Sequence, residues 1–184
     1  ICYDLGCSTG TLLHKISKRH NNKKIKLYGI DSIKEMIAQA KKENISIKNG
    51  NKIIFQNKNI NKLSILRNDL IISYYTIQFI PPRYRQSIIN NIYKSLNWGG
   101  AFIMFEKIRA NDARFQDIFS IIYNDFKLKN GFSPEEIINK TKSLKGVLEP
   151  FSDHGNLGLL KRSGFKDIIP IFQWMNFKGY LSIK

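Results

Sequence analysis

The sequence predicts an α/β fold in which a mostly parallel sheet carries helices on both faces. Two observations lead to this fold class. Short apolar runs alternate with amphipathic stretches along the chain, which is the pattern of repeated strand–helix–strand units. The run Asp69–Thr76 is almost continuously apolar, as expected of a strand that is buried on both sides. With 184 residues and 42% hydrophobic content, the chain (residues 1–184) is expected to form one domain with a full core.

The first predicted unit is a strand, a tight turn and a helix within Ile1–Leu13. Gly6 and Gly10 give the turn its backbone freedom, and the leucines that follow begin an apolar helix face. Thr9 or Thr11 is expected to cap this helix. Turns of this kind bind nucleosides, because backbone N–H groups and the positive end of a helix dipole converge there.

The groups expected to converge on the ligand are the backbone N–H groups of Cys7, Ser8 and Thr9. The second predicted strand, Ile25–Asp31, ends on an acid about twenty residues after the turn, where the dinucleotide-binding fold places a ribose-binding carboxylate. The alternative is a glycine turn without a ligand. The position of Asp31 argues against that alternative.

The remaining segments repeat the pattern. Ser32–Glu35 and Ser133–Glu136 have the residues of capping boxes. The helix predicted over Asn111–Lys129 carries aromatic and aliphatic residues at helical spacing, which indicates a core-facing helix. The second helix is predicted to run from the Ser32–Glu35 capping box to Lys42. The other predicted elements are strands at Lys52–Gln56, Asp69–Thr76 and Ala101–Lys107, helices at Pro81–Leu96 and Leu157–Arg162, and a closing hairpin of Asp167–Phe177 and Tyr180–Ile183 whose last strand is antiparallel, for seven strands in all.

The chain is strongly basic. Thirty Lys and Arg against fourteen Asp and Glu give a net charge of +16 and a pI near 9.9. This balance favours contact with nucleic acid or another polyanion. The alternative is that the charge reflects a biased amino-acid composition, because Lys occurs here together with abundant Asn and Ile. In that case the basic residues only form a solvated surface.

Other features of the composition narrow the class of protein. No apolar run is long enough for a membrane span and no leader precedes the first strand, so a cytoplasmic protein is expected. The chain starts inside a strand, and we expect its natural N-terminal segment to be missing. Cys2 and Cys7 are expected to be reduced thiols, and no residue spacing predicts a metal site.

The turn sequence D-L-G-C-S-T-G resembles the first motif of class I S-adenosylmethionine-dependent methyltransferases. Longer blocks resemble one subfamily of these, the carboxy-S-adenosyl-L-methionine synthases of the tRNA wobble-uridine pathway. The blocks are YDLGCS at Tyr3–Ser8, LNWGGAFIMFEK at Leu96–Lys107, NDFKLKNGFSPEEI at Asn124–Ile137 and FQWMNF at Phe172–Phe177. The resemblance implies a Rossmann-like class I methyltransferase fold and a homodimer. It also implies transfer of a carboxyl group from prephenate to the methyl carbon of S-adenosylmethionine. The product, carboxy-S-adenosyl-L-methionine, then serves a partner enzyme that modifies tRNA.

The resemblance also assigns cofactor-binding positions, but leaves the catalytic residues unknown. Two positions depart from the family: Tyr74 and Asn59 stand where the family has Asn and Asp, although the Tyr74 ring can still line the pocket. The implied binding residues are Gly6, Cys7 and Ser8 for the methionine and ribose side, Asp31 and Ser32 for the ribose, Asn59 and Ile60 for the adenine, and Tyr74 in the pocket wall.

A third departure concerns the transferred carboxylate. The family holds it with an Arg on the helix after the N-G-x-S turn, and this chain has Thr141 there, between Lys140 and Lys142. A hydroxyl cannot replace the fork of guanidinium donors. Two alternatives therefore remain open: an ordinary S-adenosylmethionine-dependent methyltransferase acting on a small molecule or RNA, and a non-catalytic basic module that binds tRNA or a partner enzyme.

Overall fold

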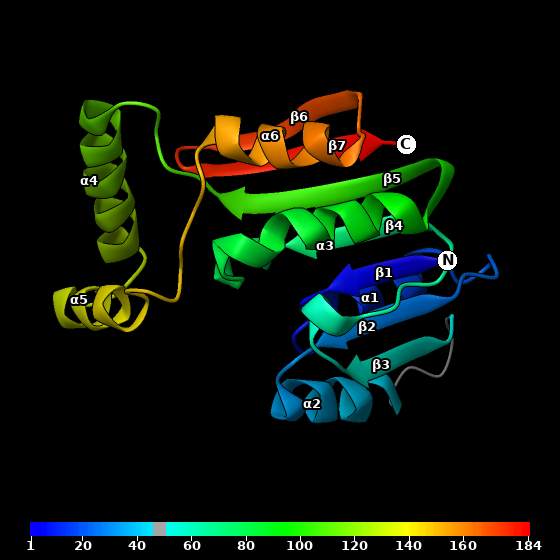
Figure 1. Cartoon of the computed structure of the whole chain (residues 1–184). Coiled ribbons are helices and arrows are strands. Elements are labelled where there is room, and N and C mark those ends of the chain that lie inside the picture. Colours follow the sequence, from blue (N-terminus) through cyan, green and yellow to red (C-terminus); the bar gives the residue numbers. More distant parts are fainter. Residues whose placement is uncertain (46–50) are drawn as a thin grey trace.

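The computed structural model describes residues 1–45 and 51–184, and these residues form a seven-stranded sheet with helices on both faces (Figure 1). The strand order is β3-β2-β1-β4-β5-β7-β6. Strands β1 to β5 pair in parallel, and β7 pairs antiparallel with both β5 and β6. The predicted fold class, with its antiparallel last strand, is confirmed. The elements are β1 (Cys2–Leu5), α1 (Thr11–Arg19), β2 (Leu27–Asp31), α2 (Lys34–Ile45), β3 (Ile53–Asn57), η1 (Ile60–Lys62), β4 (Asn68–Tyr74), η2 (Ile77–Phe79), α3 (Pro82–Ser95), β5 (Leu96–Lys107), α4 (Ala113–Lys129), α5 (Pro134–Ser143), α6 (Asp153–Ser163), β6 (Asp167–Trp174) and β7 (Phe177–Ile183).

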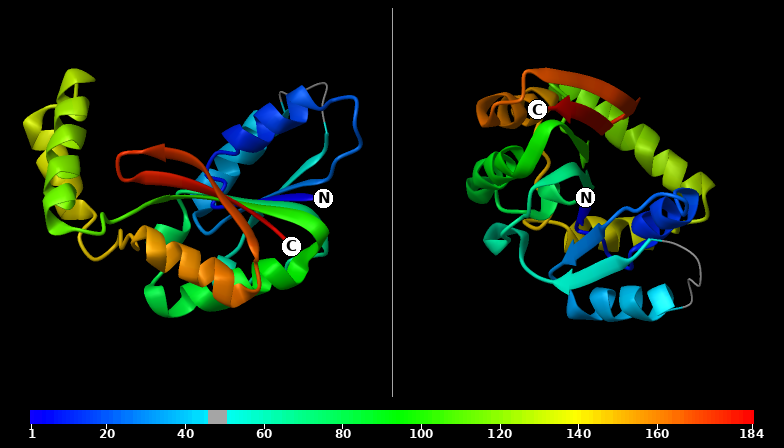
Figure 2. Two further views of the ribbon diagram at one scale, coloured as in Figure 1. Left: turned by 90° about the horizontal axis from the view of Figure 1, so that it is seen from above. Right: turned by 90° about the vertical axis from the view of Figure 1, so that its right-hand side faces the viewer.

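Each face of the sheet has its own hydrophobic core. Leu13 of α1 and Ile37 of α2 pack with Phe55 on one face. Ile89 of α3 and Leu160 of α6 pack on the other, and Figure 2 (left) shows these two helices across the sheet from α1. The alternation of strand and helix along the chain therefore places the ends of the parallel strands between two packed layers.

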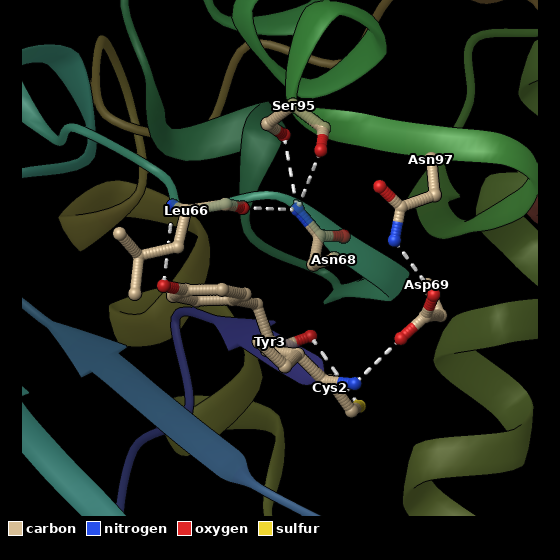
Figure 3. A network of polar contacts seen from close by, with 8 residues as sticks. Cys2, Tyr3, Leu66, Asn68, Asp69, Ser95 and Asn97 are labelled. Carbon is tan, nitrogen blue, oxygen red and sulfur yellow. Dashed lines mark hydrogen bonds and ion pairs between the residues drawn. The ribbon is translucent and has the colours of Figure 1, made fainter.

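A polar network holds the strand beginnings, at the end of the sheet opposite the site described below (Figure 3). The Asn68 side-chain amide donates to the Leu66 carbonyl at 2.8 Å and to Ser95 Oγ at 3.2 Å. The Leu66 N–H donates to the Tyr3 hydroxyl at 3.3 Å. Because Asn68 and Ser95 are buried, these bonds satisfy polar groups that would otherwise destabilise the junction of β4 with the end of α3.

Several local predictions need correction. The first helix has no threonine cap: Gly10 occupies the N-cap position in the left-handed region at φ 79°. The predicted capping box at Ser133–Glu136 is confirmed. The helix that was predicted to start at the capping box Ser32–Glu35 begins only at Lys34, and the Asp31 carboxylate accepts the Ile33 N–H at 2.9 Å.

Several element boundaries also move. Helix α6 begins at Asp153, four residues earlier than predicted, because Ser152 caps it by accepting the Gly155 N–H at 3.1 Å. Strand β5 extends back through the predicted turn to Leu96. The closing hairpin turns earlier than predicted, between Trp174 and Phe177.

Helices α4 and α5 stand apart from the rest, at the end of the sheet to which the parallel strands point (Figure 1). The prediction that the apolar face of α4 belongs to the core is wrong, since no α4 residue is buried and Phe115 is 56% exposed. Periodicity shows that one helix face is apolar, but it does not show whether this chain covers that face.

Candidate functional site

The predicted cofactor-binding residues gather around two adjoining cavities at the carboxyl ends of β1, β2 and β4. One cavity has a volume of about 470 Å³ and the other about 450 Å³, and both are lined by Gly6, Ser8 and Tyr74. Residues from segments more than fifty positions apart in the sequence thus meet at one edge of the sheet, as expected for an open parallel sheet. Of the remaining predicted residues, Cys7 lines the first cavity, and Asp31, Ser32, Asn59 and Ile60 line the second.

The glycine turn approaches its neighbours too closely for a side chain. Gly6 has φ +80°, and a Cβ there would lie 2.2 Å from Thr76 Oγ1. The turn is held to the next strand by backbone bonds, because the N–H groups of Gly6 and Cys7 both donate to the Ile30 carbonyl, at 2.8 and 3.0 Å. The expectation that the Cys7 N–H faces a ligand is therefore wrong in this structure.

Asp31 holds the turn as well as facing the second cavity. Its Oδ2 accepts the Ser8 N–H at 2.9 Å, so this N–H is also directed to the protein rather than to a ligand. Its Oδ1 accepts the Ile33 N–H at 2.9 Å. A carboxylate can accept about four hydrogen bonds, and these two leave capacity for ribose hydroxyls. The residue links the turn, β2 and the cavity.

Asp4 is the most unusual polar group of the site. It lines the first cavity and is only 2% exposed, and its Oδ1 has no hydrogen-bond partner among the described residues. Burial, and to a smaller extent the nearby charge of Asp31, raises the pKa of Asp4 to about 7. A buried carboxyl group without a partner is favourable only when a cation or donor reaches it. The site therefore fits a ligand with a positively charged end, such as the amino-acid end of S-adenosylmethionine.

Asn59 and Tyr74 both line the second cavity, but the Asn59 side chain is held by a hydrogen bond whereas Tyr74 is exposed. Asn59 Oδ1 accepts the Asn61 N–H at 2.9 Å, which caps the short helix η1 and occupies part of the amide's hydrogen-bonding capacity. The Tyr74 ring is 54% exposed and packs at 4.5 Å from the Tyr75 ring. Both residues belong to the wall of the second cavity.

Glu106 lies buried next to this wall. Its Oε1 accepts the Ile77 N–H at 3.0 Å, which fixes the segment after β4. Burial raises the pKa of Glu106 to about 8, although backbone N–H groups and the Arg85 guanidinium oppose the rise. The residue holds the cavity wall in place, and composition and spacing gave no signal of its role.

A third cavity of about 760 Å³ lies between α4, α5 and the ends of β5 and β7. Thr141, at the position where the synthase family is expected to have Arg, lines it. The Thr141 hydroxyl donates to the Ile137 carbonyl at 2.8 Å, so it contributes neither a charge nor a free donor. Lys107, Lys127 and Lys140 also line this cavity.

Metal chemistry has no evident site in the described part of the chain, where no group of His, Cys, Asp and Glu could hold an ion. Cys2 and Cys7 are free and buried. Burial raises the pKa of the Cys2 thiol to about 12 and that of Cys7 still further, so neither is a nucleophile near neutral pH. In the residues that the structure covers, no helix is long and apolar enough to cross a membrane.

Known proteins are similar to this chain in sequence and in fold. A family model described as "Methyltransferase domain" matches residues 2–100. The carboxy-S-adenosyl-L-methionine synthase of Campylobacter lari is 38% identical over 184 residues, which is 100% of this chain and 76% of that protein. The synthase of the same name from Staphylococcus epidermidis is 38% identical and covers 99% of this chain and 78% of its own.

Solved structures agree on the fold. A S-adenosylmethionine-dependent methyltransferase from Methanosarcina mazei superposes with a TM-score of 0.69 at 18% identity, covering 100% of this chain and 91% of that chain. Human N-acetylserotonin methyltransferase in complex with S-adenosylmethionine superposes with a TM-score of 0.67 at 19% identity, covering 100% of this chain and 47% of that chain.

The fold and the paired cavities define a S-adenosylmethionine-dependent transferase with the class I methyltransferase architecture. Within that class the similarity extends over the whole chain and not only over the nucleoside turn. The chain belongs to the carboxy-S-adenosyl-L-methionine synthase family.

Proposed function

We propose that this protein converts S-adenosylmethionine and prephenate to carboxy-S-adenosyl-L-methionine, phenylpyruvate and water. The observation that carries the proposal is the full-length similarity to synthases that are named for this product. When bound, S-adenosylmethionine supplies a sulfonium methyl carbon as the acceptor of the carboxyl group. The protein's own contribution is to bind, orient and exclude water.

The proposed residue roles follow from the first two cavities. Asp4 would face the cationic amino-acid end of the cofactor, because its Oδ1 has no hydrogen-bond partner among the residues that the structure describes. Asp31 and Ser32 would bind the ribose, while Ile60 and Tyr74 would enclose the adenine. Gly6 would allow the close approach of the backbone, since any side chain there meets Thr76.

The test is a mass-spectrometric assay. The protein is incubated with S-adenosylmethionine, with and without prephenate, and a product heavier than the cofactor by one carbon dioxide is expected only when prephenate is present. Asp31→Ala should lose most of this activity, whereas Asp167→Ala, at an exposed position on β6, should keep it. Unchanged cofactor in the complete reaction would contradict the proposal.

A second candidate is an ordinary methyltransferase, and the observation in its favour is Thr141, whose hydroxyl is bonded to its own helix. This function needs an acceptor molecule but no prephenate. Formation of S-adenosylhomocysteine with a small-molecule or RNA acceptor, in the absence of prephenate, would select it.

We also propose that the product serves modification of the tRNA wobble uridine, and that the basic surface contacts the tRNA or the enzyme that modifies it. The +16 net charge supports an electrostatic contact. Calorimetric titration with tRNA should show binding that weakens steeply with salt. Binding that is insensitive to salt, or no binding to tRNA and to the modifying enzyme, would contradict this part of the proposal.

We further propose a homodimer that covers the apolar face of α4. Phe115, Ile118 and Ile122 on this helix are 56%, 40% and 46% exposed. Light scattering should give twice the chain mass, and a double variant, Ile118→Asp with Ile122→Asp, should give the single-chain mass. Asp117→Lys, on the same helix, is the matched control and should remain dimeric.

A further inference from the structure

The third cavity carries an excess of positive charge. The charged side chains lining it in the described structure are Lys107, Lys127 and Lys140, against the single acid Glu136. Glu136 is already engaged, because its Oε2 accepts the Ser133 N–H at 2.7 Å in the capping box of α5. None of the three lysines forms a salt bridge among the described residues. The cavity therefore offers uncompensated ammonium groups to an anion.

Two of these ammonium groups approach one aromatic ring. Lys107 Nζ lies 5.4 Å and Lys127 Nζ 4.7 Å from the centroid of the Tyr123 ring. Burial lowers the pKa of Lys107, and the neighbouring charge of Lys127 lowers it further. Burial also lowers the pKa of Lys127. Two like charges held close together in a partly buried cavity repel each other, and an anion bound between them would relieve the repulsion.

The walls of the cavity are suited to a ring. Tyr123, Phe126, Phe132 and Phe177 line it together with aliphatic side chains. The Tyr123 and Phe177 rings meet edge to face at 5.2 Å, which keeps both in fixed orientations. A ligand with an apolar ring and carboxylates at its ends would match the combination of aromatic walls and lysines.

The cavity adjoins the cofactor cavities. Phe79 lines both the third cavity and the one that contains Asp31. Tyr75, in the wall of the Asp31 cavity, packs edge to face on Phe177 at 5.7 Å. A molecule in the third cavity would thus lie directly beside one bound at the nucleoside turn.

We propose that this cavity is the site of the dicarboxylate substrate, and that Lys107 and Lys127 bind its carboxylates. The inference rests on the proposed function. Lys107 and Lys127 would supply the positive charge for the carboxylates that Thr141 does not provide. Lys107 is fixed from β5, where its N–H donates to Gln78 Oε1 at 2.7 Å, and Lys127 is presented by α4. One ammonium group comes from the sheet and the other from the helix layer, so the position of α4 determines whether the pair can bind one ligand.

The test separates binding from turnover. Binding of prephenate to the protein saturated with S-adenosylmethionine is measured by calorimetry at mildly alkaline pH, together with KM for each substrate. Lys107→Met and Lys127→Met should each raise the Kd and KM for prephenate about 10- to 100-fold, as expected for loss of a charged hydrogen-bond donor. The Kd for S-adenosylmethionine should stay within about twofold, because these lysines do not line the first two cavities.

The chain offers a matched control. Lys129→Met removes the same charge from the same helix two residues further on, at an exposed position outside the cavity, and should leave prephenate binding unchanged. Lys127→Arg should restore most of the binding, which a purely structural role would not require. The melting temperature of each variant reports whether the fold is retained.

The outcomes distinguish the two proposals. Lysine-dependent binding of prephenate supports the inference, even if no carboxylated product forms and the proposed function fails. If prephenate binds and reacts but the two cavity variants behave like Lys129→Met, the inference is overturned while the proposed function stands. If the unmodified protein does not bind prephenate at all, the inference is overturned as well.

Discussion

The buried carboxyl group of Asp4, whose Oδ1 has no hydrogen-bond partner in the described part of the chain, leads to the sharpest prediction about this site. Asp4→Asn keeps the shape of the side chain but removes its ability to carry a negative charge. The substitution should weaken binding of S-adenosylmethionine. It should also make the ligand-free protein more stable at neutral pH, because the unmodified protein loses stability as the pH rises and the variant should not. Opposite effects on binding and stability are expected when a group is retained for a ligand rather than for the fold.

The magnitude follows from the pKa of Asp4. Burial raises this pKa from 3.8 to about 7. The pKa of Asp4 is higher in the folded state than in the unfolded state, so folding favours the protonated carboxyl group. The contribution of Asp4 to the free energy of unfolding is therefore fully present below pH 3.8 and is lost as the pH rises through about 7. Between about pH 5 and about pH 8 this single group should lower the free energy of unfolding by roughly 2–3 kcal/mol. For a chain of this length that corresponds to about 5–10 °C in the melting temperature.

The assay is thermal and chemical unfolding of the ligand-free protein across this pH range, paired with calorimetry of cofactor binding. The melting temperature of the unmodified protein should fall more steeply with pH than that of Asp4→Asn, by the amount given above. The affinity of the unmodified protein for S-adenosylmethionine should rise with pH to about 7 and then level off. Asp4→Asn should bind about 10- to 100-fold more weakly, with no such rise.

The matched control is Asp167→Asn, an exposed acid at the start of β6. It should reproduce the pH dependence of the unmodified protein. If Asp4→Asn and the unmodified protein lose stability in parallel between about pH 5 and pH 8, the carboxyl group is not raised in pKa. If Asp4→Asn also binds the cofactor normally, the assignment of Asp4 to the cationic end is wrong.

Three further predictions test other parts of the site. Gly6→Ala places a methyl group 2.2 Å from Thr76 Oγ1 and should lower the free energy of unfolding, measured by urea titration, by about 2–4 kcal/mol. Gly146 also has a positive φ, +73°, but has open space around it, so Gly146→Ala should lower the free energy of unfolding by only about 1 kcal/mol. Thr141→Arg should lower the KM for prephenate about tenfold by adding a guanidinium fork to the third cavity, and an unchanged KM would show that the cavity does not hold the carboxylate. Glu106→Gln should abolish the stability loss that this residue causes as the pH rises from 4.5 through about 8, and melting curves with an unaltered pH slope would contradict the raised pKa.

Much of the architecture could be predicted because its signals are local. The alternation of apolar runs and helix faces gave the strand and helix order, and Asp69–Thr76 was recognised as a buried strand by its continuous apolarity. Gly164, in the left-handed region at φ 115°, ends α6 one residue after the predicted Leu157–Arg162 helix. Two of the corrections concern caps: Ser152 starts α6 earlier than predicted, and Gly10 replaces the threonine cap of α1.

The site was predicted less completely than the fold. Asp31 lines the second cavity because it ends β2, and the strand pattern predicted this strand end, whereas Asn59 was assigned from the family resemblance and lines the same cavity. The hydrogen bonds could not be predicted, since the Cys7 and Ser8 N–H groups are satisfied by β2 residues rather than left for a ligand. The pairing of Lys107 with Lys127 depends on where α4 lies, and no pattern in the chain specifies that position.

The amino-acid sequence by itself determined the class of this protein: a parallel sheet, a nucleoside turn and an acid at the end of the neighbouring strand. Its blocks of similarity also determined the synthase family. Only the tertiary structure decided that the face of α4 is exposed and that two lysines face one cavity. It also decided that Asp4 is buried with its Oδ1 unpartnered within residues 1–45 and 51–184. The physical reason is that periodicity and turn chemistry act over a few residues. Burial, hydrogen-bond satisfaction and charge repulsion depend instead on how segments far apart in the chain pack together.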